Sequence, residues 1–225
     1  PEKGVIPPAK FIPLAEESGS IIAITDWVLK TACHQTKQWH DAGYGMIPVA
    51  VNLSACSFKQ NSLQSQIKET LETTGLLPQL LELELTESIL IENDKQAEET
   101  LRELHKLGIK ITIDDFGTGY SSLSYLHRFP ISVLKIDRSF VWNMHRSEND
   151  MAIVVAIIAM AHSLKLQVVA EGVETEKQLN TLKKCGCEII QGYLTGKPTD
   201  SSEIVEQLQK NCSIEGTERH FSSEE

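Results

Sequence analysis

Short runs of leucine and β-branched residues alternate along this chain with longer segments of helical periodicity. Strand patterns are predicted at 48–53, 80–85, 109–113, 133–136, 167–170 and 188–190. Helical patterns are predicted at 21–42, 63–74, 93–107, 121–128, 150–164 and 175–184, with a last helix that begins near Ser202. Strands that alternate with helices indicate βαβ units and a parallel sheet. We therefore predict an α/β fold, a TIM-like (β/α)8 barrel.

The strand patterns are too few for a closed barrel. Besides the six clear ones, only Val5-Ile6 is a weak candidate, whereas a closed barrel has eight strands. The deficit lies at the N-terminus, where the chain starts at Pro1 without a methionine, so we expect the first strand to be missing from this chain. We expect residues 1–210 to form the barrel domain, incomplete at its N-terminus, and residues 211–225 to form a polar, frayed tail.

Each predicted strand ends in polar or acidic residues. These residues are Asn52, Glu84, Glu87, Asp114, Asp115, Lys135, Asp137, Glu171 and Gln191. Because the carboxyl ends of barrel strands face one shared pocket, we expect a single oxygen-rich site. Oxygen ligands favour Mg²⁺ or Mn²⁺ over Zn²⁺, and two such ions ~3.5–4 Å apart suit attack of water on a phosphodiester. Most of the seven histidines fall on predicted helices, where surface or packing roles are expected.

Structural interpretations compete with this site. The aspartate pair and the glycines that follow it also suit a turn, and Asn52 also suits a helix cap. Lys135 lies within an apolar strand and needs a partner, so it forms either a buried salt bridge or a cation beside a nucleophilic water. Glu82, on the same strand face as Glu84, is expected to be solvated. A barrel aldolase with Lys135 as a Schiff base is disfavoured, because neighbouring carboxylates would raise the pKa of the amine.

Composition limits the partners and the compartment. A net charge of -10 disfavours duplex nucleic acid as a partner. The five cysteines are odd in number and contain no CxxC pair, so we expect free thiols in a reducing, cytoplasmic setting. The longest apolar run, residues 151–161, is too short for a bilayer, which needs ~20 residues. We expect no membrane segment in this chain, although the cytoplasmic part of a membrane-anchored protein would look the same.

Seven phrases of the chain together resemble one family. In order they are IPPAKFIPLAEESG, VNLS, ELTES, DDFGTGYSSLSYL, LKIDRSF, AEGVE and QGYL. From Pro1 to about Pro198 the chain is similar to the EAL domain, the bacterial cyclic di-GMP phosphodiesterases of second-messenger signalling. The resemblance implies a modified (β/α)8 barrel that linearises cyclic di-GMP to pGpG with Mg²⁺ or Mn²⁺ at a two-metal site. It also implies a homodimer, and upstream sensory or GGDEF-type domains in the parent protein.

The resemblance further implies roles for individual residues. Metal ligands at one ion would be Asn52, Glu84 and Asp114, with Asp115 at the second ion. Glu171 would lie at the metal site and serve as base, and Lys135 would hold the attacking water. Glu87 would anchor the loop 116–124, which family members use in dimerisation and activation. Residues near the substrate or the hydrolytic water would be Asp137, Gln191 and Asn52.

The chain departs from the family pattern in one respect. The signature Glu-Ala-Leu and the substrate-contacting arginine that follows it belong just upstream of Pro1, so one metal ligand is absent. Two hypotheses result. Either the parent protein is a phosphodiesterase and this fragment is impaired, or the domain is inactive and serves as a cyclic di-GMP-binding or protein-interaction module.

Overall fold

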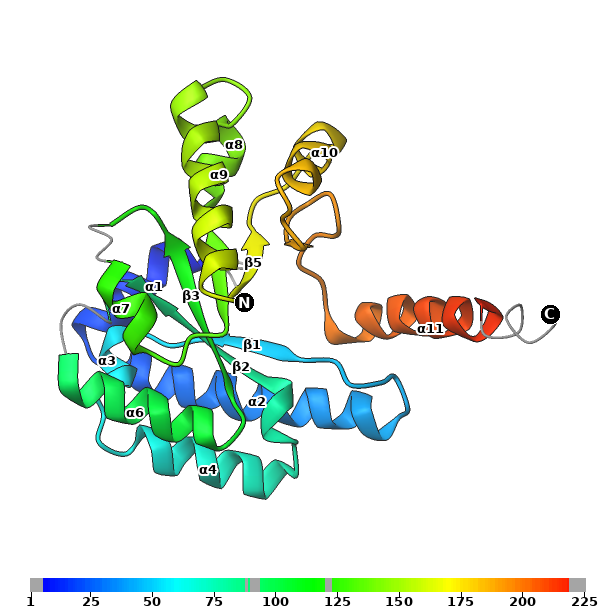
Figure 1. The fold of residues 1–225 in the computed structure, drawn as a ribbon. Helices are drawn as coiled ribbons and strands as arrows, with labels where there is room; N and C mark the ends of the chain where they lie inside the picture. The colour runs from blue at the N-terminus through cyan, green and yellow to red at the C-terminus, as the bar shows by residue number, and fades with distance from the viewer. Residues whose placement is uncertain (1–5, 88, 90–93, 120–122, 219–225) are drawn as a thin grey trace.

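A single parallel sheet organises the chain. The computed structural model describes residues 6–87, 89, 94–119 and 123–218. Six parallel strands pair in sequence order and form a half-barrel (Figure 1). The strands are β1 (Val49–Asn52), β2 (Leu81–Thr86), β3 (Lys110–Phe116), β4 (Val133–Ile136), β5 (Gln167–Ala170) and β6 (Ile189–Ile190). The predicted α/β class is therefore confirmed, and all six predicted strand positions hold a strand.

Helices follow the strands and cover the sheet. They are α1 (Pro8–Glu17), α2 (Ile21–Asp41), α3 (Ala55–Phe58), α4 (Leu63–Thr74), η1 (Pro78–Leu80), α6 (Asp94–Lys106), α7 (Leu123–Arg128), α8 (Arg138–Asn143), α9 (Glu148–Ser163), α10 (Glu176–Lys184) and α11 (Ser201–Glu218). Helices α2, α4 and α6 lie side by side against β1–β3, and α11 extends away from the body (Figure 1).

The alternation of leucine and glutamate in β2 separates the two faces of the sheet. Leu81, Leu83 and Leu85 are fully buried in the main hydrophobic core. Glu82 and Glu84 point to the opposite face, because successive strand residues alternate. There Glu82 is half-buried and accepts a hydrogen bond from the Thr112 hydroxyl of β3. The expectation that Glu82 is solvated is therefore wrong, since the same face that carries Glu84 is the interior of the half-barrel.

Strand registers bring the polar strand ends to one level. Asn52 of β1 pairs with Glu84 of β2, and Thr86 pairs with Asp114 of β3. Parallel pairing with these registers places the carboxyl ends of neighbouring strands at the same edge of the sheet. The predicted convergence of these residues at one end of the sheet is thus a direct result of the register.

Several helix boundaries follow local signals in the sequence. Thr175 accepts a hydrogen bond from the Gln178 N–H, and the Gln178 side chain returns to the Thr175 N–H, which is the predicted capping box of α10. Ser54 caps α3 through the Ser57 N–H. Helix α4 ends at Gly75, whose φ of 69° is the left-handed conformation that glycine adopts most easily.

Other elements escaped the sequence patterns. Helix α1 forms within the proline-rich start of the chain. Pro8 is compatible with the helix because it lies in the first turn, where no intrahelical N–H bond is needed. Helix α8 has six residues, too few to show a period. Ile6 has no regular structure, and Val5 lies outside the described residues. Helix α11 continues to Glu218, past residue 211 where a frayed tail is expected to begin, and the division at residue 210 stays a prediction.

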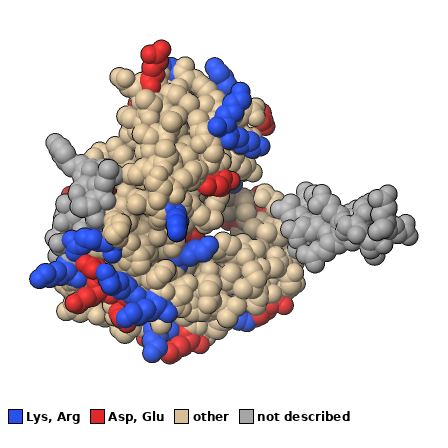
Figure 2. All heavy atoms as spheres, in the orientation of Figure 1, with Lys and Arg blue, Asp and Glu red and all other residues tan. Residues whose placement is uncertain are grey.

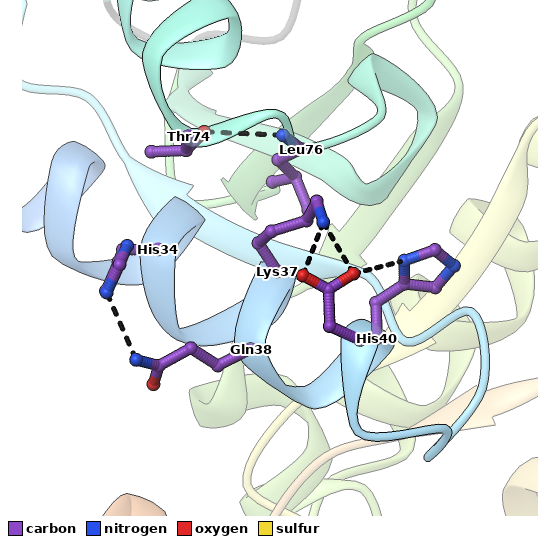
Figure 3. A network of polar contacts seen from close by, with 7 residues as sticks. His34, Lys37, Gln38, His40, Thr74 and Leu76 are labelled. Carbon is purple, nitrogen blue, oxygen red and sulfur yellow. Dashed lines mark hydrogen bonds and ion pairs between the residues drawn. The ribbon is translucent and has the colours of Figure 1, made fainter.

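The outer helices are held by local polar contacts. In α2, His34 bonds to Gln38, and Lys37 pairs with Asp41, as Figure 3 shows. The aliphatic part of Lys37 also packs near Gly75, where an added Cβ would lie 3.4 Å from the Lys37 Cε. The two polar contacts lie within α2, and the Lys37 side chain brings the end of α2 close to the end of α4.

Charged side chains of both signs are interspersed on the surface. Over α4 and α6 the ion pairs Lys68–Glu72, Arg102–Glu98 and Lys106–Glu103 join neighbouring turns. Figure 2 shows basic and acidic groups mixed on this part of the molecule rather than gathered in one basic patch. In the part of the chain that the structure describes, no helix combines the length and apolarity needed to cross a membrane.

Gln178 links α10 to two other segments, which generates a stability prediction. Its Oε1 accepts the N–H groups of Glu174 and Thr175, both at 2.9 Å, and its Nε2 donates to the Val141 carbonyl of α8 at 3.2 Å. Replacing Gln178 with alanine removes all three bonds and leaves the carbonyl of the buried Val141 without this donor, so we expect the free energy of unfolding to fall by about 2–3 kcal/mol. Urea unfolding measures this change. The exposed neighbour Lys177→Ala is the control, with an expected change within about 0.5 kcal/mol, and equal losses in both variants would contradict the prediction.

Candidate metal centre

A buried lysine lies at the centre of the polar strand ends. The Lys135 Nζ, on β4, lies 2.6 Å from Glu171 Oε1, 2.9 Å from Glu84 Oε1 and 3.3 Å from Asp114 Oδ1. Only 5% of the lysine side chain is exposed. The buried salt bridge, one of the two roles considered for Lys135, is present, and it joins β4 to carboxylates at the ends of β2, β3 and β5. Such an ion pair tolerates burial only when its partners surround it closely.

The pKa of Lys135 depends on the carboxylates around it. Burial lowers the pKa of Lys135, but hydrogen bonds to Glu171 and Glu84 and the nearby carboxylate charges outweigh burial, so the net pKa is raised. Lys135 therefore stays an ammonium at neutral pH. A Schiff-base lysine needs a lowered pKa, and the prediction that the neighbouring carboxylates prevent this is confirmed.

For Glu84 and Glu171, burial and the opposite charge shift the pKa in the reverse directions to their effects on Lys135. Burial raises the pKa of Glu84 and the pKa of Glu171, while the hydrogen bond and charge of Lys135 oppose that rise. For both groups burial is the largest effect, so the net pKa stays above its ordinary value, and the charge of Asp114 adds to the rise. The three carboxylates therefore carry more negative charge than the one lysine neutralises, which is the electrostatic condition for binding a further cation.

A local irregularity in β3 brings two consecutive aspartates to the same place. The pairing of β3 with β4 shifts register between Ile113 and Phe116, and Asp115 has φ 53°. The Asp115 N–H donates to Asp114 Oδ1 at 3.0 Å. Burial, the Asp114 charge and a hydrogen bond with Asp137 raise the pKa of Asp115 to about 6. In a regular strand these two side chains would point to opposite faces.

The carboxylates fit a divalent metal ion. Asp114, Asp115 and Glu171 each offer an oxygen, and these atoms lie within 4.8 Å of one another. An all-oxygen donor set suits Mg²⁺ or Mn²⁺. Among the described residues no histidine belongs to this group. His34 and His40 bond within α2 instead, to Gln38 and Asp41 (Figure 3).

Glu87 lies against the loop that follows the aspartates. Only 4% of Glu87 is exposed, just beyond the end of β2. A Cβ added to Gly119 would lie 3.4 Å from Glu87 Oε2, so the loop backbone packs directly on this carboxylate. The structure thus brings Glu87 to the loop 116–124, of which residues 120–122 lie outside the described residues.

Asp137 begins α8 and lies beside the metal centre. Its Oδ1 accepts the Ser139 N–H at 2.9 Å and also the Ser139 hydroxyl. Burial would raise the pKa of Asp137, but the two bonds from Ser139, the hydrogen bond with Asp115 and the charge of Arg138 together lower it. Asp137 therefore combines a structural cap with the hydrogen bond to Asp115.

Gln191 and Asn52 lie on either side of the centre. Gln191 follows β6, where its N–H donates to the Ala170 carbonyl at 2.9 Å and its carbonyl accepts the Val173 N–H at 3.1 Å. It lines a cavity of about 270 Å³ together with Glu171. Asn52 is exposed at the end of β1 and lines a separate cavity of about 720 Å³ beside α1 and α2.

Two charged residues of the site were missed by the sequence reasoning. Arg138 and Glu174 line the same 270 Å³ cavity as Glu171 and Gln191. The signal was present, because Arg138 directly follows Asp137, and Glu174 follows Glu171 by three residues in one loop. Both residues lie beyond the strand ends, and a search for polar residues at strand ends does not reach them.

The dependence of the carboxylates on Lys135 generates a prediction about pH. Lys135→Met removes their positive partner, so we expect the free energy of unfolding to fall by about 3–5 kcal/mol at pH 8. A carboxyl whose pKa is higher in the folded than in the unfolded protein destabilises the fold when ionised, and this cost declines as pH falls through the folded pKa. The loss of unfolding free energy caused by Lys135→Met should therefore be smaller at pH 5 than at pH 8.

Urea unfolding in EDTA at pH 5, 6 and 8 measures this difference. The control is Lys106→Met, which removes an exposed ion pair with Glu103 and should cost no more than about 1 kcal/mol, largely independent of pH in this range. A Lys135→Met deficit that stays constant with pH would contradict the prediction.

Comparisons with known proteins agree on one family. Residues 1–198 match the EAL domain. The chain is 46% identical over 209 residues to cyclic di-GMP phosphodiesterase NbdA of Pseudomonas aeruginosa, covering 93% of this chain and 27% of that protein. It is 43% identical over 198 residues to cyclic di-GMP phosphodiesterase PdeR of Escherichia coli, covering 88% of this chain and 30% of that protein. The chain thus spans less than a third of the length of these relatives.

Solved structures agree with this result. A complex of the MucR phosphodiesterase with cyclic di-GMP superposes with a TM-score of 0.89 at 44% identity, covering 91% of this chain and 83% of that one. The EAL domain of DcpA from Mycobacterium smegmatis superposes with a TM-score of 0.81 at 39% identity, covering 84% and 85%. The half-barrel, its carboxylate centre and these likenesses lead to one conclusion: the chain belongs to the EAL domain family.

Proposed function

We propose that this domain hydrolyses cyclic di-GMP to linear pGpG with Mg²⁺ or Mn²⁺. The observation that carries the proposal is the convergence of Glu84, Asp114 and Glu171 on the buried Lys135, with Asp115 close to Asp114 and Glu171. Four adjacent strand ends supply these groups in a member of the EAL family, and relatives named as cyclic di-GMP phosphodiesterases support the substrate.

The metal ions would be held by the carboxylates and by Asn52. Glu84, Asp114 and Asn52 would bind one ion, Asp115 would bind the second, and Glu171 would lie at the metal site. When bound, such ions lower the pKa of water and stabilise the charge that develops on a phosphoryl group. Asn52 fits this role by its register beside Glu84.

Lys135 and Glu171 are positioned to handle the attacking water. The Lys135 ammonium, held by Glu84 and Glu171, donates a hydrogen bond that orients the water oxygen toward phosphorus. Glu171 accepts the proton that the water loses, and its raised pKa suits a base. The new bond forms between water oxygen and phosphorus, and the bond from phosphorus to the 3′ oxygen breaks, leaving a 5′ phosphate and a 3′ hydroxyl after proton uptake.

The remaining residues would shape the site. Glu87 would hold the loop after β3 through its contact with Gly119, keeping the paired aspartates in place. Asp137, fixed by Ser139, would contact the substrate or the hydrolytic water beside Asp115. Gln191 would do so from the adjoining cavity.

Turnover in matched variants tests the function. Glu84→Gln keeps the shape of the side chain but removes a metal-binding charge, so we expect cyclic di-GMP hydrolysis with Mn²⁺ to fall at least about a hundredfold. Glu82→Gln is the control, because Glu82 lies two residues earlier on the same face and bonds to Thr112. Its turnover should stay within about twofold. Equal rates in the two variants would refute the role of Glu84.

The assay should compare two lengths of chain. The Glu-Ala-Leu signature is not among these 225 residues, so a version extended upstream by about 20–30 residues, enough for a strand and its loop, is the second sample. Turnover in the extended version supports the phosphodiesterase. Binding of cyclic di-GMP without turnover in either version supports the alternative, a sensor or protein-interaction module.

We further propose that the domain forms a homodimer through α8 and α9. Helix α8 exposes Trp142 (49%) and α9 exposes Val155 (44%), apolar side chains that a partner copy would bury. Val155→Glu should shift the mass measured by light scattering from dimer to monomer. Ser163→Glu, at the C-terminal end of α9, is the control and should stay dimeric. A wild-type monomer at all concentrations would overturn this proposal.

The native polypeptide is proposed to carry further signalling domains in a cytoplasmic setting. A relative, MucR of Pseudomonas aeruginosa, is a bifunctional diguanylate cyclase/cyclic di-GMP phosphodiesterase, and the aligned region covers only 30% of it. Cys33, Cys56, Cys185 and Cys187 are free thiols in the structure, which is compatible with a reducing compartment.

A further inference from the structure

The proposed substrate creates a charge problem at the site. Cyclic di-GMP carries two phosphodiester groups and therefore two negative charges. The centre itself holds the carboxylates of Glu84, Asp114, Asp115, Asp137 and Glu171, and its one lysine is already paired with three of them. Bound metal ions would neutralise the negative charge of the phosphate that is hydrolysed. The second phosphate needs a cation that is not already engaged by protein carboxylates.

Arg138 is placed to supply that cation. It is the first residue of α8, directly after Asp137, and its side chain is exposed. Its charge helps to lower the pKa of the neighbouring Asp137, but neither a hydrogen bond nor a salt bridge joins its guanidinium to another residue of the described chain, so its donors are open to a ligand. Arg138 lines two neighbouring cavities of about 340 Å³ and 270 Å³, and the second is also lined by Glu171 and Gln191.

A glycine fixes the base of Arg138 against the loop that carries Glu171. Gly172 has φ +68°, and a Cβ added there would lie 2.6 Å from the Arg138 Cβ, closer than real side chains approach. The backbone of this loop therefore rests directly on Arg138. This contact holds Arg138 beside the residue after Glu171, while the flexible end of its side chain remains available to a ligand.

We propose that Arg138 is a substrate-binding residue that donates hydrogen bonds to a phosphate of the cyclic dinucleotide that is not being hydrolysed. The inference rests on the proposed function and adds a residue to it. An arginine fork matches two phosphate oxygens at once and keeps its charge at every physiological pH. Lys135 is unsuited to this task, because the site already uses its charge and its donors.

Steady-state kinetics of the native polypeptide with Mn²⁺ tests the role. Arg138→Gln keeps the Cβ that packs on Gly172 but removes the charge. We expect KM for cyclic di-GMP to rise about tenfold or more, as for a lost charge-assisted hydrogen bond, with kcat within about twofold. Arg138→Lys keeps the charge without the fork and should give an intermediate KM. KM of the wild type should rise with ionic strength more steeply than KM of Arg138→Gln, since screening weakens only the charged contact.

Arg146→Gln is the matched control. Arg146 follows α8 and lies over the Trp142 ring, outside both cavities. A KM change in Arg138→Gln no larger than in Arg146→Gln overturns the inference, as does a fall in kcat with unchanged KM. If the wild type itself neither binds nor hydrolyses cyclic di-GMP, the proposed function fails first. If the wild type is active and only the Arg138 result is negative, the inference alone fails.

Discussion

The site depends on the buried cation that holds three carboxylates together. Glu84, Asp114 and Glu171 come from the ends of three strands, and without Lys135 their mutual repulsion would act where little solvent screens it. Breaking a buried ion pair leaves an uncompensated charge in a medium of low polarity, which is among the most destabilising local changes known in proteins. The lysine therefore stabilises the folded chain while it leaves an excess of negative charge for metal ions.

The hydrophobic pattern predicted the sheet well and the helices unevenly. Leu81, Leu83 and Leu85 alternate with polar residues, so both the strand and its buried face could be read from the sequence. Helix α8 has six residues and no period, and its only local signal is the Asp137 cap, which sequence reasoning had interpreted as a site residue. The proline-rich start concealed α1, because proline is compatible with the first turn of a helix and with a loop.

The sequence predicted those site residues that lie at the ends of strands. The convergence on Lys135 follows from parallel pairing, which is a general rule, and the salt bridge follows from the cost of burying a lysine. The irregular register in β3, which lets Asp115 join Asp114, is a property of the folded backbone that no pattern of residue types encodes. Arg138 and Glu174 stand close to predicted site residues in the sequence, but that they line one cavity depends on how the start of α8 packs on the loop after β5.

The loops after β5 and β6 have an additional property. A Cβ on Gly192 would lie 2.3 Å from the Val173 carbonyl oxygen, so the two loops are in backbone contact. The Val173 N–H is itself bonded to the Gln191 carbonyl, and β6 contributes only two residues of its own to the sheet. A displacement of either loop must therefore move the other. The segments that carry Glu171 and Gln191 act as one mechanical unit, in which a ligand that immobilises one loop also orders the second.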